Sequence, residues 1–95
     1  MKILASEQVQ RWLVSLPPDS KKRARAALRG LRNGRGDIKA LRGELEGFSR
    51  LRIGGLRVVY SQHLGKVIRL EYADCRDAVY ETFLKVLHER RMPKR

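Results

Sequence analysis

LEGFSRLRIGGLRVVYSQ, residues 45–62, reads as two β-strands joined at Gly54-Gly55. In the first strand, basic side chains alternate with small or apolar ones, in the order Ser49, Arg50, Leu51, Arg52 and Ile53. Side chains of a strand point alternately to its two faces, so the two arginines share one face. A Gly-Gly pair between two such runs is typical of a two-residue hairpin turn, whose central residues both take positive φ. The pattern therefore predicts a β-hairpin with its arginines on a single face.

The second strand of this hairpin adds a third basic side chain, Arg57, beside the first two. No acidic residue lies between Glu46 and Glu71, so none of the three arginines has a partner nearby in the sequence. Guanidiniums bind phosphate groups through two parallel hydrogen bonds. The hairpin face is therefore a candidate anion-binding surface, although arginines on an antiparallel sheet also commonly face solvent without a ligand.

The whole chain carries a large excess of positive charge. It has 95 residues, with 22 Lys and Arg against 10 Asp and Glu, for a formal charge of +12. This length fits one small domain, residues 1–95. The charge favours a polyanionic partner, either a nucleic acid or an acidic protein. A single cysteine, Cys75, indicates a reducing compartment, and with no signal peptide or membrane-length apolar run the sequence predicts a cytoplasmic protein.

Five further segments have the patterns of regular secondary structure. They are an edge strand at residues 2–5, a helix capped by Ser6 that ends at Pro17-Pro18, a helix capped by Asp19 or Ser20 that runs to Leu31, a strand from Lys66 to Ala73, and a helix from Asp77 to Arg91. Residues 34–37 are expected to form a loop. The order predicts an α+β fold: an antiparallel sheet with an N-terminal helical hairpin and a C-terminal helix.

Alternation in the last predicted strand places Ile68, Leu70 and Tyr72 on one face. Arg69 then points to the other face. If the apolar faces of all three strands share one core, Arg69 joins the hairpin arginines on the opposite side of the sheet.

The second predicted helix is densely basic, with no acidic residue between Asp19 and Asp37. Its basic residues are Lys21, Lys22, Arg23, Arg25, Arg29 and Arg32. Such a run usually forms a solvated helix face, but solvated faces normally mix both signs of charge. The alternative is an RNA-binding surface, on which each phosphate contact adds affinity with little sequence information.

The sequence offers few residues for metal or cofactor chemistry. No Gly-rich phosphate loop precedes a helix, and His63, His88 and Cys75 lack the spacing of metal ligands, so no cofactor is expected. Arg76 and Tyr80, four residues apart, share one face of the last helix. Together with the hairpin arginines they are candidates for a site that stabilises a negatively charged phosphorus and stacks on a base or moves a proton. The same spacing also fits a tyrosine that is simply packed in the core.

Two motifs carry a family resemblance. They are Leu41-x-Gly43 followed by SRLRIGGLRVVY at residues 49–60, and RDAVY at residues 76–80. In this order they resemble the RelE/ParE toxin superfamily, over nearly the whole chain from Lys2 to His88. The resemblance implies a RelE-like fold and, in the RelE branch, the toxin of a type II toxin–antitoxin pair that cuts messenger RNA on the ribosome without a metal. The implied partners are messenger RNA, ribosomal RNA and an acidic segment of a cognate antitoxin.

The resemblance also implies roles in a reaction in which a ribose 2′-hydroxyl attacks the adjacent phosphate. Arg50 and Arg52 occupy the positions of a basic pair, and Arg57 that of the arginine that stabilises the phosphate. Arg76 occupies the position of a proton donor, and Tyr80 that of the residue that stacks on a base. Many ribonucleolytic members have lysines at the basic pair. An arginine is nearly always protonated, so this chain lacks an obvious general base there.

The ParE branch of the superfamily keeps the fold but inhibits DNA gyrase, and it usually lacks the cluster of basic residues and tyrosine. Retention of that cluster here favours the ribonuclease branch. A catalytically inert RNA-binding domain is a third hypothesis, in which the hairpin arginines only anchor phosphates.

Overall fold

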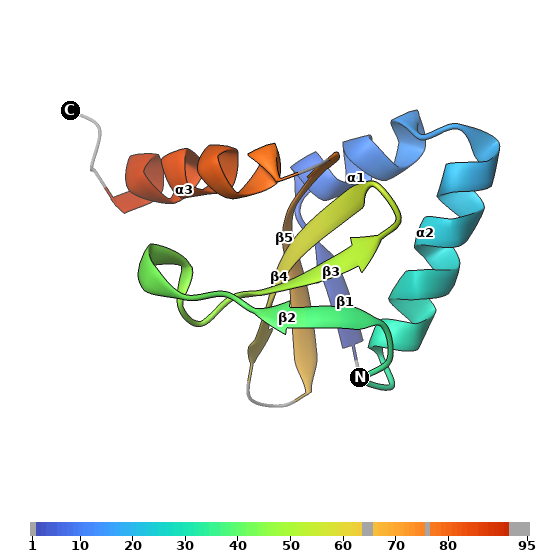
Figure 1. Cartoon of the computed structure of the whole chain (residues 1–95), viewed down its shortest axis with the longest axis horizontal. Coiled ribbons are helices and arrows are strands. Elements are labelled where there is room, and N and C mark those ends of the chain that lie inside the picture. Colours follow the sequence, from blue (N-terminus) through green and yellow to red (C-terminus); the bar gives the residue numbers. More distant parts are fainter. Residues whose placement is uncertain (1, 64–65, 76, 92–95) are drawn as a thin grey trace.

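The computed structural model describes residues 2–63, 66–75 and 77–91, which form an α+β fold (Figure 1). In chain order the elements are β1 (Lys2–Ala5), α1 (Glu7–Ser15), α2 (Pro18–Leu31), β2 (Asp37–Ala40), a short 3-10 helix (Gly43–Leu45), β3 (Ser49–Ile53), β4 (Leu56–His63), β5 (Val67–Cys75) and α3 (Ala78–Arg91). The predicted fold class, with two N-terminal helices and a C-terminal helix, is confirmed. Within the described residues, no helix has the length and apolar character needed to cross a membrane.

The strands form one five-stranded sheet in the order β1-β5-β4-β3-β2. The pairs among β2, β3, β4 and β5 are antiparallel, whereas β1 pairs in parallel with β5. The predicted edge position of β1 is therefore correct. The predicted antiparallel sheet is correct for every pair except this one.

Two hydrophobic cores cover the two faces of the sheet. One core packs Val9 of α1 and Leu31 of α2 against Val58 and its neighbours. The other packs Phe83 of α3 against Val59. Val58 and Val59 are consecutive in β4 and both fully buried, so they point to opposite faces. Helices α1 and α2 therefore cover one face of the sheet and α3 covers part of the other.

The hairpin of β3 and β4 has the predicted register, with Arg52 opposite Arg57 and Leu51 opposite Val58. Leu51 is fully buried under α1 and α2, and the arginines lie on the α3 side. The turn differs in one detail, because Gly54 has a φ of 59° while the φ of Gly55 is not positive. This is the pattern of a type II′ turn, in which only the first central residue needs positive φ.

Two local predictions were wrong. Helix α2 begins at Pro18 after Pro17, with no side-chain cap from Asp19 or Ser20. Proline suits the first helical turn because its missing N–H would have no partner there. In addition, Asp37 was assigned to a loop, but it begins β2, which pairs with β3 at the edge of the sheet.

A β-bulge in β5 overturns the predicted face of Tyr72. The register shifts between Val59 and Tyr60, whose partners are Tyr72 and Leu70, so Glu71 is an extra residue in the ladder. Beyond the bulge the alternation is reversed. Tyr72 therefore lies in the core under α3 and not in the core under α1 and α2.

A candidate active site among basic strands

A cleft of about 430 Å³ opens on the α3 side of the sheet. Its described lining comes from β2, β3, β4, the residue after β2, and the start of α3 with the residue before it. These residues are Lys39, Leu41, Arg50, Arg52, Arg57, Asp77 and Tyr80. The structure thus brings together four of the five predicted catalytic residues. The fifth, Arg76, lies outside the described residues. The geometry places these side chains together, while their catalytic roles stay predictions.

Two cross-strand pairs of like charge form the floor of this cleft. Lys39 of β2 lies opposite Arg50 of β3, and Arg52 of β3 lies opposite Arg57 of β4. Residues directly opposite each other on an antiparallel pair share a face and come within about 5.5 Å at Cβ, where like charges are destabilising. Four cations on three adjacent strands therefore concentrate positive potential at one place. Such an arrangement suits a bound anion.

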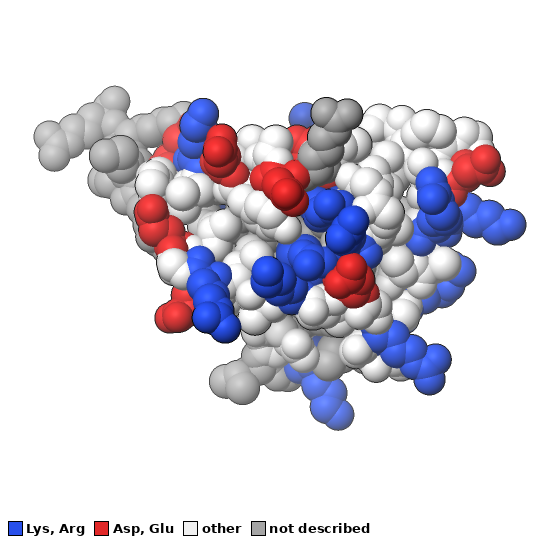
Figure 2. Space-filling view, viewed as in Figure 1, with Lys and Arg blue, Asp and Glu red and all other residues white. Residues whose placement is uncertain are grey.

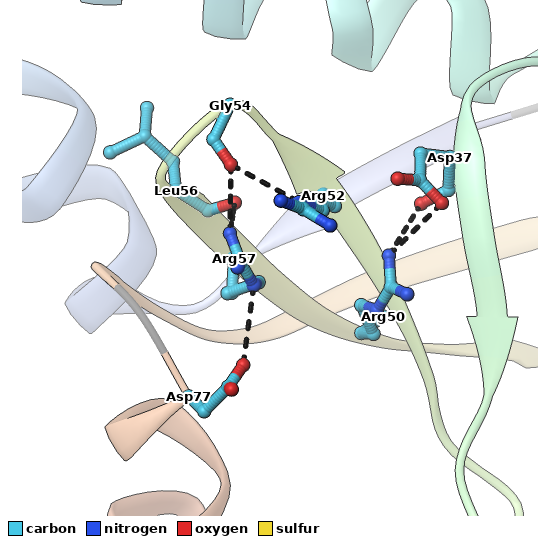
Figure 3. Close-up of polar contacts among 7 residues, drawn as sticks. All are labelled: Asp37, Arg50, Arg52, Gly54, Leu56, Arg57 and Asp77. Atoms are coloured by element: carbon cyan, nitrogen blue, oxygen red, sulfur yellow. Dashed lines mark hydrogen bonds and ion pairs between the residues drawn. The ribbon is translucent and has the colours of Figure 1, made fainter.

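Arg57 is held in a defined orientation (Figure 3). Its Nη1 donates to the carbonyl oxygens of Gly54 at 2.9 Å and of Leu56 at 3.2 Å. Its Nε lies 3.5 Å from Oδ1 of Asp77, which precedes α3. The side chain of Arg57 is only 12% exposed, so burial and these contacts fix the guanidinium before any ligand arrives.

Arg50 is fixed in a similar way at the other end of the cleft. Its Nη1 donates to the backbone carbonyl of Asp37 at 3.1 Å and to Oδ1 of the same residue at 3.2 Å. The side chain of Arg50 is 14% exposed. Figure 3 shows Asp37 and Asp77 on opposite sides of the arginine cluster, each contacting a different arginine. The two carboxylates therefore orient the outer arginines without covering the exposed Arg52 between them.

Tyr80 is half-buried and contributes to two environments. It packs against the core that contains Val59 and Phe83, and it also lines the cleft. Both sequence-based interpretations of this residue therefore describe part of its setting. A tyrosine wall beside a basic floor offers a ring for stacking on a nucleobase while the guanidiniums contact its phosphate.

Arg69 lies between Ile68 and Leu70 of the core under α1 and α2, so it points to the face of the hairpin arginines, as predicted, but it does not line their cleft. It pairs with Ser61 and lines a separate cavity of about 90 Å³ with residues of β1, including Leu4. The cause is distance along the sheet: Arg69 belongs to β5, and β4 lies between β5 and β3.

The basic residues of α2 and Arg32, which caps its C-terminus, lie on a different part of the surface. These are Lys21, which is half-buried, and the exposed Lys22, Arg23, Arg25, Arg29 and Arg32. Figure 2 shows basic side chains gathered over the middle strands and further ones towards the α2 side of the molecule. Arg25 and Arg29 line a groove of about 600 Å³ with Ile3 of β1. Arg23 reaches towards the hairpin, since its Nη1 lies 3.9 Å from where a Cβ on Gly54 would be. The RNA-binding role of this helix stays a prediction.

Three residues of the cleft were missed from the sequence: Lys39, Leu41 and Asp77. For Lys39 a weak signal existed, because Ile38 and Ala40 flank it in an alternating pattern typical of a strand. For Asp77 no local signal existed. Its contact with Arg57 spans twenty residues of chain and depends on where α3 begins.

The described residues of this cleft do not assemble a set of metal ligands. Among the described residues, no group of three or more His, Cys, Asp or Glu side chains is positioned to hold a metal ion. His88 is hydrogen-bonded to Glu44 at 3.1 Å on an exposed surface. Cys75 is exposed at the end of β5. The chemistry available in the cleft is therefore that of guanidiniums, one amine, one carboxylate and one phenol.

No protein-family model matches this chain, and no curated protein matches its sequence. Solved structures do match its fold. One is the toxin–antitoxin complex RelBE2 from Mycobacterium tuberculosis, with a TM-score of 0.68 and 24% identity over 79% of this chain and 96% of the other. Another is the archaeal RelE–RelB complex from Pyrococcus horikoshii, with a TM-score of 0.65 and 27% identity over 80% of this chain and 94% of the other.

The YoeB–YefM complex from Staphylococcus aureus is a further neighbour, with a TM-score of 0.63 and 19% identity over 78% of this chain and 94% of the other. At these identities the likeness concerns the fold. The RelBE2 structure, a RelB–RelE structure from Methanococcus jannaschii and a second YoeB–YefM structure from Staphylococcus aureus are complexes of a toxin with its antitoxin.

Proposed function

Because its fold is that of the RelE toxins, we propose that this chain is the toxin of a type II toxin–antitoxin pair and an endoribonuclease that cuts messenger RNA on the ribosome. The observation that carries the proposal is two cross-strand pairs of like charge on the floor of a cleft that Tyr80 also lines. Lys39 lies opposite Arg50, and Arg52 lies opposite Arg57. Asp37 lies opposite Arg52 and Asp74 lies opposite Arg57 on the flanking strands, so these carboxylates offset part of the repulsion. The described lining of the cleft still holds four cations against one carboxylate, and a bound anion suits that excess.

The reaction suited to these groups is an intramolecular transesterification at a phosphodiester bond of RNA. The 2′-oxygen of a ribose forms a bond to the adjacent phosphorus, and the bond from phosphorus to the 5′-oxygen of the next nucleotide breaks. The products are a 2′,3′-cyclic phosphate and a free 5′-hydroxyl. This step needs no metal if cationic side chains stabilise the extra negative charge on the phosphorane.

The residues divide this work according to their positions. Arg57, fixed by two carbonyls, presents its guanidinium to the non-bridging phosphate oxygens. Arg50 and Arg52 add positive charge along β3, where the RNA backbone binds in this proposal. Tyr80 stacks on a neighbouring base and holds the reacting linkage in line. Arg76 is the proposed proton donor to the leaving 5′-oxygen.

The charge of +12 has two uses in this proposal. In the active state the cleft and α2 contact messenger and ribosomal RNA in the cytoplasm. In the silenced state an acidic antitoxin segment neutralises the same surfaces, in line with the antitoxin chains present in the neighbouring structures.

Mapping of transcript ends by primer extension tests the proposal. The chain is expressed from an inducible promoter beside Arg57→Ala and Tyr80→Ala, and beside Arg11→Ala as a matched control. Arg11 is an exposed arginine of α1 paired with Glu7. We expect codon-linked cuts with 5′-hydroxyl ends in the unaltered chain and in Arg11→Ala, and loss of these cuts in the two cleft variants. Intact transcripts with relaxed DNA would instead favour gyrase inhibition, and intact transcripts without a DNA effect would favour an inert RNA-binding domain.

A further inference from the structure

The cleft needs a group that accepts the proton of the attacking 2′-hydroxyl. Its described cationic residues, Lys39, Arg50, Arg52 and Arg57, are donors of hydrogen bonds and carry no free acceptor when protonated. Tyr80 is a phenol, which must itself lose a proton before it can accept one. These groups bind and orient a phosphate, but none is a ready base.

Asp77 is the one carboxylate among the described residues that line the cleft. It lies at the end of the loop into α3, and its backbone carbonyl accepts a hydrogen bond from the N–H of Tyr80 at 3.1 Å. Its Oδ1 lies 3.5 Å from Nε of Arg57. The backbone hydrogen bond fixes the position of Asp77 just before α3, and the ion pair with Arg57 holds its carboxylate at the cleft.

The side chain of Asp77 is 81% exposed, whereas that of Arg57 is 12% exposed. The arginine is therefore anchored and the carboxylate is accessible to a substrate. Asp37 differs, because it contacts Arg50 from outside and is not part of the cleft lining. A third carboxylate, Asp74 of β5, lies opposite Arg57 in the strand ladder. Of these three carboxylates, Asp77 is the one among the described residues that line the cleft.

From this geometry we infer that Asp77 is the general base of the reaction. One oxygen of its carboxylate removes the proton of the 2′-hydroxyl while the 2′-oxygen bonds to phosphorus. The bond to the 5′-oxygen then breaks, and that oxygen takes a proton from water or from the newly protonated Asp77. This inference rests on the proposed ribonuclease function and supplies the acceptor that an arginine-rich site lacks.

Several charged or titratable groups face Asp77 and bear on its pH dependence. They are Arg57 from β4, Arg50 and Arg52 from β3, Lys39 from β2 and Tyr80 from α3, together with Asp74 of β5, which lies opposite Arg57. A carboxylate base predicts a cleavage rate that falls on the acidic side as the base becomes protonated.

Single-turnover cleavage of ribosome-bound messenger RNA across a range of pH tests the inference. The variants are Asp77→Asn, Asp77→Glu and the matched control Glu81→Gln, which removes an exposed carboxylate from the first turn of the same helix. We expect Asp77→Asn to lose about 100-fold or more in rate and to lose the acidic limb of the profile, because general bases contribute about 10²–10⁴-fold. Asp77→Glu should keep part of the rate with an acidic limb, and Glu81→Gln should match the unaltered chain.

The affinity for RNA distinguishes a general base from a residue that only positions Arg57, because the two roles predict different effects of Asp77→Asn on binding. Affinity for the same messenger RNA with a 2′-O-methyl group at the cleavage site is measured on ribosomes for each variant. We expect Asp77→Asn to bind as tightly as the unaltered chain or more tightly, since it removes a negative charge beside the phosphate. Weaker binding with an unchanged acidic limb would make Asp77 a residue that only positions Arg57, and would overturn the inference. If the unaltered chain does not cleave at all, the proposed function falls and the base falls with it.

Discussion

Arg52 of β3 and Arg57 of β4 lie directly opposite each other, and both donate to the carbonyl oxygen of Gly54, at 3.4 and 2.9 Å. One carbonyl dipole thus orients two guanidiniums at the hairpin turn. It offsets only part of their repulsion, since opposing like charges destabilise a strand pair by a few tenths to about 1 kcal/mol. The positive charge that remains is available to a ligand.

Replacing Arg52 should therefore affect the stability of the fold and the binding of an anion differently. We expect Arg52→Thr to change the free energy of unfolding by less than about 1 kcal/mol at low salt, because it removes the repulsion from Arg57 together with the attraction to Asp37, which lies opposite it on β2. It should also reduce the rise in Tm that inorganic phosphate produces in the unaltered chain. Thermal unfolding with and without phosphate measures both effects, and Arg11→Ala should keep the full rise. Equal phosphate effects in all three proteins would show that the cleft is not the anion site.

The basic face of α2 is tested through the salt dependence of RNA binding. We expect Arg25→Ala and Arg29→Ala each to weaken binding of single-stranded RNA, and to weaken it equally for different base sequences. Each should lower the slope of log affinity against log salt by about 0.7, the value for one phosphate contact on a single strand. Arg11→Ala on α1 is the matched control. An unchanged slope in the α2 variants would mean that this helix face is only solvated.

The hairpin and its arginine face could be predicted from the sequence because both depend on local rules. Alternation with a period of two sets which side chains share a face, and a Gly-Gly pair fixes the turn. Arg50, Arg52 and Arg57 therefore meet as expected. Tyr80 joins them because α3 packs on this face of the sheet, and in the sequence the family resemblance, not the helical spacing, favours this position.

The remaining features depend on contacts between distant segments. β2 has four residues and only Ile38 is partly buried, so its pairing with β3, not its own pattern, makes it a strand. The bulge that redirects Tyr72 arises from the fit between β4 and β5 and leaves no mark in either sequence. Asp77 reaches Arg57 only because α3 starts beside β4. Neither Lys39 nor Asp77 could therefore be assigned to the site in advance.

Gly36 is required by the turn that leads into β2. Its φ is 126°, and an added Cβ would come within 2.8 Å of Cδ1 of the fully buried Leu51. We expect Gly36→Ala to lower the free energy of unfolding by about 1–3 kcal/mol or more, through backbone strain and overpacking. Gly34→Ala is the matched control, since it has a φ of 70° but open space around it, and should lose about 1–2 kcal/mol. Urea unfolding measures the difference in free energy of unfolding between the two variants, provided that the slope of this free energy against urea concentration is unchanged. A loss no larger than that of the control would argue against the close approach to Leu51.

Tyr60 gives the fold a dependence on alkaline pH. It is 5% exposed, and burial raises its pKa above the usual value of 10.0, although a hydrogen bond with Ser49 opposes the rise. The folded state therefore favours the neutral phenol. This contribution to stability is fully present below the unfolded pKa and is lost as pH rises through the higher folded pKa, by at most about 1.4 kcal/mol per pH unit.

We expect Tyr60→Phe to remove this loss. Near pH 8 the variant should be less stable by about 1 kcal/mol, because it lacks the hydrogen bond. Towards about pH 11, where tyrosines titrate, the unaltered chain should lose stability faster than the variant, so the difference narrows or reverses. Ser49→Ala keeps the buried phenol and should retain the steep alkaline loss. Urea unfolding at a series of pH values measures all three proteins. Parallel curves for Tyr60→Phe and the unaltered chain would contradict the assignment, since they would place the alkaline titration at another group.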